Sequence, residues 1–367
     1  MADVMSTSAL LIMFATSLAS IGTLLVLFER HIGGKPLLNY EFRQRVPWRA
    51  GIVLVMMILT FSGVALTLAA IANDHEEQAE VASAPEVNES TRAEAREQDI
   101  TESSQVEEQA NSLEFIVNSL GFTAFSIMLV VAVGGWLNIS VGASPVDLGL
   151  PTSGEQVLQD IKIGCVACVA SLLPIYVLQI VLISLFEPQL EHPLIERLSE
   201  NHSPAMLLAG FLLAVVAAPL SEEFIFRLVL QGWLERWEDE TIGYTGSMRP
   251  HIENGLPEME VPGSEFGGDR SHSFEEKLAV LPDQTPAPQP GSGVLSSLPH
   301  GWLPILISGT LFGLAHLGHG VSPIPLVLFG VVLGYLYQRT HRLVPSITAH
   351  ALFNAYSMIM LWLQLGD

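Results

Sequence analysis

The chain has 367 residues, of which 49% are hydrophobic and only 15% are charged, and its mean hydropathy is +0.42. This composition is typical of a membrane protein and argues against a soluble globular domain. The formal net charge of -22 argues against nucleic acid as a partner, and most of the surplus acid lies in two polar stretches.

Eight apolar segments are candidates to cross a bilayer, which requires about 20 apolar residues. We expect a break near Pro219 in the fifth segment, because proline disrupts helical hydrogen bonding. The sequence therefore predicts an all-α, polytopic membrane bundle with about eight transmembrane helices. The segments are residues 7–28, 51–73, 113–138, 160–186, 204–236, 302–318, 322–338 and 343–365.

Two polar stretches interrupt this pattern, and both are expected to be disordered acidic insertions. They are rich in Glu, Ser, Pro or Gly, so neither can bury enough apolar surface to offset its ordering entropy. They divide the chain into five parts. These are an N-terminal two-helix membrane segment (1–73), an acidic loop (74–112), a membrane core (113–236), a Pro/Gly-rich insertion (237–300) and a C-terminal membrane core (301–367).

The distribution of Lys and Arg predicts the orientation in the membrane, because cytoplasmic loops retain positive charge. Residues 29–51 contain five of these cations, so we place this loop in the cytoplasm. With eight crossings, twelve Lys and Arg fall on the cytoplasmic side and three on the other. We therefore expect a multi-pass protein of the plasma (inner) membrane with both termini on the non-cytoplasmic side.

The stretch SEEFIFR places two carboxylates and a guanidinium in an apolar environment, where ionisable residues are costly and indicate a functional site. Glu223 and Arg227 are four residues apart, so on a helix they share a face and can form an ion pair. Glu222 lies about 100° away around the helix and is the freer carboxylate. It is therefore the candidate general base. A charged collar at the membrane surface is the alternative.

Two further apolar segments carry histidines. Phe312 and His316 are four residues apart in LFGLAHLGHG, and a neutral imidazole in a bilayer needs a hydrogen-bond partner. In ITAHALFNAYS, His350 and Asn354 share a helical face and can direct N–H donors to one point, as an oxyanion site requires. A structural His–Asn pair that joins two helices is the alternative.

The three sets follow one another as E-E-x-x-x-R, F-x-x-x-H and H-x-x-x-N. This order resembles the CPBP family of intramembrane endopeptidases, which comprises CAAX prenyl proteases and bacteriocin-processing enzymes and was formerly called the Abi family. The resemblance covers about residues 140–365 and includes a DLGL turn at 147–150. It does not extend to the N-terminal helices or to the two polar insertions.

The resemblance implies an enzyme that hydrolyses membrane-associated proteins or peptides within membrane lipid. In this family the first Glu and the motif-two His are taken to activate a water, which implies Glu222 and His316 here. The motif-three His and Asn are taken to form the oxyanion site, which implies His350 and Asn354. The residues that would support this site are Glu223, Arg227 and Phe312.

A zinc-dependent intramembrane metalloprotease is an alternative, in which Glu222, His316 and His350 bind the metal and one position stays open for water. Two features favour a mechanism without a cofactor. The sequence lacks an H-E-x-x-H arrangement, and the amide of Asn354 is a poor zinc ligand.

A non-proteolytic membrane transporter or binding protein is the other hypothesis, because buried Glu, Arg and His also form the proton relays of transporters. Internal repeats would favour a transporter. None is evident between the two halves of the sequence, so the endopeptidase is preferred.

Overall fold

A computed structural model describes residues 7–41, 45–63, 65, 93–186, 203–242, 300–317 and 322–365 of the chain. Within these ranges all regular secondary structure is helical, as the sequence predicts. The N-terminal half contains α1 (Thr7–Ile32), a short helix (Ala50–Gly63), α3 (Ala93–Val141) and α4 (Gly154–Phe186). The C-terminal part contains α10 (Trp302–Leu314), α11 (Pro323–Thr340) and α12 (Leu343–Leu365).

Between these parts, one long helix changes its hydrogen-bonding period along its length. Two of its sections are π-helical, with hydrogen bonds between residues five apart instead of four. In order, the sections are α6 (Pro204–Phe211), the π-helix η1 (Leu212–Ala217), α7 (Ala218–Glu222), the π-helix η2 (Glu223–Gln231) and α8 (Gly232–Ile242).

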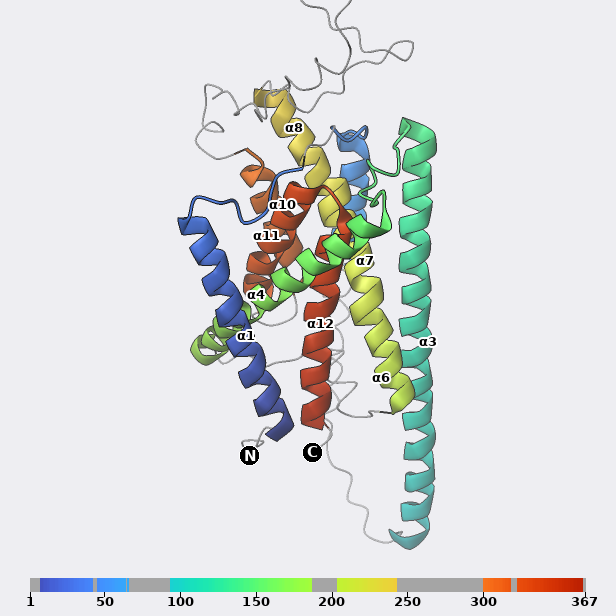
Figure 1. Ribbon diagram of the computed structural model, residues 1–367. Coiled ribbons are helices and arrows are strands. Elements are labelled where there is room, and N and C mark those ends of the chain that lie inside the picture. Colours follow the sequence, from blue (N-terminus) through green and yellow to red (C-terminus); the bar gives the residue numbers. More distant parts are fainter. Residues whose placement is uncertain are drawn as a thin grey trace, which may run out of the picture.

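The helices form a bundle in which α12 packs between α4 and the long helix (Figure 1). α1 packs on α4, α3 runs along α6 to α7, and α10 packs against both α11 and η2. α1 begins and α12 ends at the same end of the bundle, opposite α8. The long helix is therefore placed where α3, α10 and α12 can all contact it.

The number of transmembrane helices predicted from the sequence is not confirmed. Four of the described helices are long and apolar enough to cross a membrane: α1, residues 112–141 of α3, α4, and the long helix from α6 to α8. The expected span at 302–318 contains a helix of 13 residues, which at about 1.5 Å per residue is shorter than a hydrocarbon core. The expected span at 51–73 is described only at residues 51–63 and 65.

Helices extend into the edges of both polar stretches. Residues 93–112 are part of α3, and residues 237–242 are part of α8. The first of these stretches is rich in Ala, Glu and Gln, which favour helices, and it extends a helix that the apolar segment already nucleates. The remainder of the two predicted insertions, residues 74–92 and 243–299, lies outside the described residues.

Close backbone approaches fix the helices on either side of the long helix. A Cβ atom on Gly309 of α10 would lie 2.8 Å from the backbone nitrogen of Val331 in α11. A Cβ atom on Gly164 of α4 would lie 2.6 Å from the Cβ of Thr348 in α12. Small residues allow such approaches between membrane helices, where dispersion contacts replace the hydrophobic driving force.

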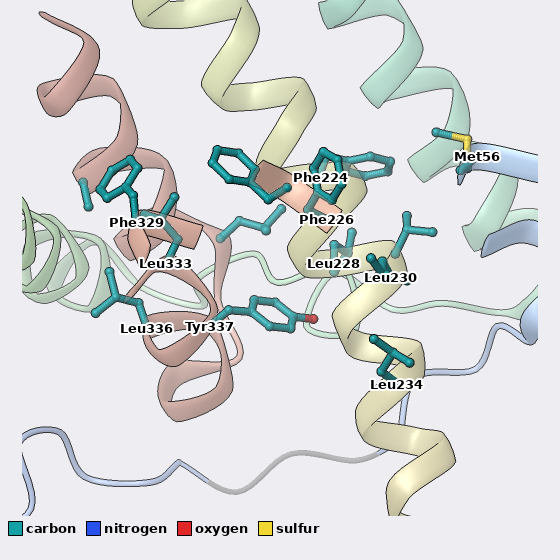
Figure 2. Packing of buried hydrophobic residues seen from close by; sticks show 14 of the residues in the cluster. Met56, Phe224, Phe226, Leu228, Leu230, Leu234, Phe329, Leu333, Leu336 and Tyr337 are labelled. Carbon is teal, nitrogen blue, oxygen red and sulfur yellow. The ribbon is translucent and has the colours of Figure 1, made fainter. Parts of the chain in front are cut away.

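η2 and α11 share one part of the buried apolar core, which also includes residues of α3, α4, α10 and α12. Figure 2 shows Phe226 and Leu228 of η2 together with Phe329 and Leu333 of α11 in one packed layer. Tyr337 extends from α11 toward the long helix and is fully buried. This layer packs η2 against α11, and the first turn of η2 is buried as well, since Glu223, Phe224 and Phe226 are each at most 3% exposed.

A proline inside α4 creates a docking point for α1. Pro174 has no N–H, so the carbonyl of Ala170 four residues earlier lacks its helical donor. Ser20 of α1 is fully buried and its hydroxyl donates to the Ala170 carbonyl at 3.4 Å. The same hydroxyl accepts the N–H of Leu173 at 3.3 Å. A side chain from another helix thus satisfies the backbone group that a proline leaves unpaired.

His300 connects the start of α10 to the end of α8. Its Nε2 lies 2.6 Å from Oδ1 of Asp239 and 3.8 Å from Oε2 of Glu238, and the N–H of Gly301 donates to Glu238. Burial alone lowers the pKa of His300. The hydrogen bond to Asp239 and the charges of Asp239, Glu238 and Glu235 outweigh burial, so this pKa lies above its ordinary value of 6.5.

The raised pKa of His300 predicts a pH-dependent contribution to stability. Because the folded protein binds this proton more tightly than the unfolded chain, the contribution is complete below about pH 6.5 and is lost as the pH rises through the raised pKa. Replacing His300 by glutamine is therefore expected to lower the thermal midpoint more at about pH 5.5 than at about pH 9. Thermal unfolding of both proteins in one detergent checks this, and equal decreases at the two pH values would contradict it.

Candidate active site

The two carboxylates lie at a junction in the long helix, since Glu222 ends α7 and Glu223 begins η2. π-Helical segments are rare and often occur at functional sites. The Glu223 side chain is fully buried, whereas that of Glu222 is 25% exposed. The Oε2 atom of Glu222 is itself buried and has no hydrogen-bond partner among the described residues. The two neighbouring acids therefore have very different environments.

Pro219 and Asn354 together explain the geometry before this junction. The N–H of Ala218 donates to the carbonyl of Leu213, five residues earlier. The next carbonyl in this pattern, that of Ala214, would pair with residue 219, whose proline nitrogen has no hydrogen. Asn354 of α12 replaces the missing donor, because its Nδ2 donates to the Ala214 carbonyl at 2.8 Å. Asn354 thus connects α12 to the helix that carries the carboxylates.

The expected ion pair between Glu223 and Arg227 is present and completely buried, with 3.1 Å between Oε2 and Nε. Nη1 of Arg227 donates to the hydroxyl of Ser308 in α10 at 3.0 Å, and Ser308 donates to the Phe226 carbonyl. These bonds join η2 to α10. Each buried charge thus has a polar partner, which is necessary because an unpaired buried charge is costly.

His350 of α12 lies between the two carboxylates. Its Nδ1 is 2.9 Å from Oε1 of Glu223, and its Nε2 is 3.9 Å from Oε2 of Glu222. Because an ionised carboxylate only accepts hydrogen bonds, Nδ1 carries a hydrogen and Nε2 is the atom directed at Glu222. The ring is almost fully buried. Glu223 therefore orients the imidazole, and the Glu223–Arg227 pair is a support for His350.

His316 lies two residues after the end of α10 and approaches the same carboxylate. Its Nδ1 lies 2.8 Å from the carbonyl of Phe312, which accepts a hydrogen bond and cannot donate one. Nε2 is therefore the atom directed at Glu222, and it lies 3.7 Å from Oε2. With 21% of its side chain exposed, His316 is, like Glu222, one of the accessible members of the site.

Aromatic rings enclose the buried side of the site. The fully buried ring of Phe312 lies 5.0 Å from the ring of His316 and 5.5 Å from that of His350, measured between centroids. The guanidinium carbon of Arg227 lies 4.9 Å above the same ring. Phe329 contacts His350 edge to face at 5.6 Å. Phe312 therefore packs against three of the polar side chains and restricts their orientations.

The structure brings Glu222, His316 and His350 together from the long helix, the end of α10 and α12. Asn354 lies one turn beyond His350, and one of its two amide hydrogens is engaged by Ala214. Sequence reasoning missed Ser308, the direct partner of Arg227. Its position as a small polar residue within the apolar stretch ILISGTLF was the available signal.

The rings of His316 and His350 are oriented in the same way toward Glu222. In both histidines Nδ1 donates to a protein acceptor and Nε2 points at Glu222, an orientation that metal-binding histidines also adopt. However, no group of three His, Cys, Asp or Glu side chains in the part of the chain that the structure describes is arranged to hold a metal ion. The orientation of the rings is thus explained by Phe312 and Glu223.

Comparison with protein families gives a match in the C-terminal part of the chain. A family model described as type II CAAX prenyl endopeptidase Rce1-like matches residues 292–356. This segment contains Phe312, His316, His350 and Asn354, whereas the carboxylate pair lies outside it. The family resemblance inferred from the three motifs is therefore confirmed over this segment. No curated protein and no solved structure matches the chain significantly.

Proposed function

We propose that the protein is an intramembrane endopeptidase, starting from its match to the CAAX prenyl endopeptidases. One observation carries the proposal: Oε2 of Glu222 lies 3.7 Å from Nε2 of His316 and 3.9 Å from Nε2 of His350. A water molecule among these atoms would have a base to accept its proton and two ring nitrogens to orient it. This arrangement supports hydrolysis of a carbonyl compound.

In the proposed reaction, Glu222 takes a proton from the water as the water oxygen bonds to the scissile carbonyl carbon. The resulting tetrahedral intermediate carries its negative charge on the former carbonyl oxygen. When the carbon–nitrogen bond breaks, Glu222 returns the proton to the leaving nitrogen. The products are a carboxyl group and an amine, and Glu222 is again a carboxylate. Such proton transfer typically contributes about 10²- to 10⁴-fold in rate.

His350 and Asn354 are proposed to stabilise the oxyanion. An amide nitrogen has two hydrogens, so Asn354 keeps one after donating to Ala214. His350 donates from Nε2 when both ring nitrogens carry hydrogen. Glu223 fixes the His350 ring, which supports this role because oxyanion donors act best when their orientation is set in advance.

The substrate is proposed to be a peptide or protein anchored in the membrane, with a prenylated C-terminus as the first case to test because of the family match. From the distribution of Lys and Arg, we also propose that the protein spans the plasma (inner) membrane with both termini on the non-cytoplasmic side. In this orientation α8 lies at the cytoplasmic end of the bundle, opposite the termini.

The test uses the purified full-length protein in detergent and a farnesylated peptide that ends in a C-a-a-X sequence. The same peptide without the farnesyl group is the matched substrate control. Mass spectrometry should detect release of the C-terminal tripeptide, and a His316→Ala variant should release it much more slowly. If the parent protein cleaves neither of these nor a transmembrane peptide, the proposal is wrong. Loss of cleavage in a chelator, restored by zinc, would support the metalloprotease instead.

A further inference from the structure

Residues 46–48, which we call the strap, belong to the N-terminal part that has no family resemblance, yet they contact the helix that carries the carboxylates. Trp48 is only 1% exposed, and its Nε1 donates to the carbonyl of Val229 at 3.1 Å. Val229 lies in the last turn of η2, two residues after Arg227. An N-terminal side chain thus bonds to the backbone of the candidate active-site helix.

The Val229 carbonyl accepts this bond at a place where the helix has a surplus acceptor. The N–H of Gly232 donates to the carbonyl of Arg227, five residues earlier, and α8 then returns to the spacing of four. The carbonyls of residues 228–230 therefore have only the N–H groups of residues 233 and 234 as main-chain donors. Buried carbonyls need hydrogen-bond donors. Three carbonyls share two main-chain donors here, and the indole N–H of Trp48 is the third donor.

The strap is held in place by bonds to other parts of the bundle. Nη1 of Arg236 in α8 contacts all three strap carbonyls at 3.0 to 3.3 Å. On the N-terminal side of the strap, the carboxylate of Glu41 and that of the fully buried Asp160 both accept hydrogen bonds from Arg342, which directly precedes α12. The donor on Trp48 is therefore presented to η2 by a fixed segment.

We propose that Trp48 is a positioning residue for the reaction, which holds η2 in the register that brings Glu223 to Nδ1 of His350. The inference rests on the proposed endopeptidase function. Without the indole N–H, the surplus carbonyl favours a return to α-helical spacing, and a shift of one residue turns a helix by about 100°. Such a shift would displace both carboxylates from the histidines.

The test replaces Trp48 by phenylalanine, which keeps an apolar ring and removes the N–H. With a cleaved peptide substrate, kcat is expected to fall about tenfold or more while KM stays within about twofold, because misplaced catalytic groups slow chemistry more than binding. Hydrogen exchange of a peptide covering residues 223–234 should also become faster. An unchanged kcat, a change in KM alone, or unchanged exchange would overturn the proposal.

Two control variants accompany this test. The first measures the general effect of removing an indole, and the second replaces Trp48→Phe if that variant misfolds. Trp136→Phe removes an indole from a half-exposed position on α3 and should match the parent protein in kcat and exchange. If Trp48→Phe is not recovered as a folded protein, Arg236→Gln releases the strap and carries the same expectations. If the parent protein cleaves nothing, the proposed function fails, but unchanged exchange in Trp48→Phe would still show that Trp48 does not hold η2.

Discussion

Replacing Arg227 by methionine is expected to destabilise the folded protein by about 3–5 kcal/mol, because it leaves the buried charge of Glu223 without its cation. Both side chains are fully buried, so water cannot compensate for the loss. Ser308 and the ring of Phe312 would also lose their contacts with the guanidinium. Denaturant unfolding in detergent micelles measures the change in the free energy of unfolding.

The double variant Glu223→Gln with Arg227→Met is the matched control for this prediction. It removes both charges, so it should recover part of the lost stability relative to Arg227→Met alone. A single variant as stable as the parent protein would show that the ion pair is not what stabilises η2. A double variant less stable than the single one would show that Glu223 is stabilising through His350 and not through Arg227.

Replacing Glu222 by glutamine is expected to lower kcat by about 10²- to 10⁴-fold, because the amide cannot accept the proton of the attacking water. The fold should be unaffected, since the Glu222 side chain is partly exposed and its Oε2 makes no hydrogen bond within the described residues. Initial rates of tripeptide release and thermal midpoints measure the two effects separately.

Glu155→Gln is the matched control for Glu222→Gln, since it changes an exposed carboxylate in the first turn of α4. It should leave both rate and stability at the level of the parent protein. If Glu222→Gln cleaves as fast as this control, Glu222 is not the base. If instead it loses its rate only together with its thermal midpoint, the effect is structural.

Residue spacing correctly predicted the ion pair between Glu223 and Arg227. Glu223 and Arg227 are four apart, so they share a face and pair in the structure, which leaves Glu222 as the carboxylate that faces the histidines. His316 and His350 were recognised as polar residues within apolar segments, each four residues from a second residue of its motif. What spacing could not predict is that Glu223 would also hold Nδ1 of His350, because that contact depends on how α12 crosses the long helix.

The π-helical sections could not be predicted from local sequence. Pro219 indicates a break, but the pairing on either side depends on donors from elsewhere in the chain. Asn354 lies 140 residues from the carbonyl that it satisfies, and Trp48 lies 181 residues from its own. Whether the helix kinks or changes its helical period depends on such distant hydrogen bonds. The pattern of residues 204–236 alone does not predict them.

Apolar length was a weaker guide to the membrane spans. It identified the regions that form α1, α3, α4 and the long helix, but the other four expected spans are not confirmed within the described residues. α10 has only 13 residues, which is too short to cross a membrane. Its start is fixed by the bonds of His300 and Gly301 to α8. Helix ends set by tertiary contacts are not visible in hydropathy.

Glu222 is proposed to activate a water that attacks the peptide directly, and a single turnover in ¹⁸O-labelled water distinguishes this from attack by Glu222 itself. With enzyme in excess over the farnesylated peptide, the new carboxyl group of the product should contain one ¹⁸O atom, and Glu222 should contain none. Label in the Glu222 carboxylate with an unlabelled product would instead show that Glu222 itself attacks the peptide. That result would contradict its proposed role as a base.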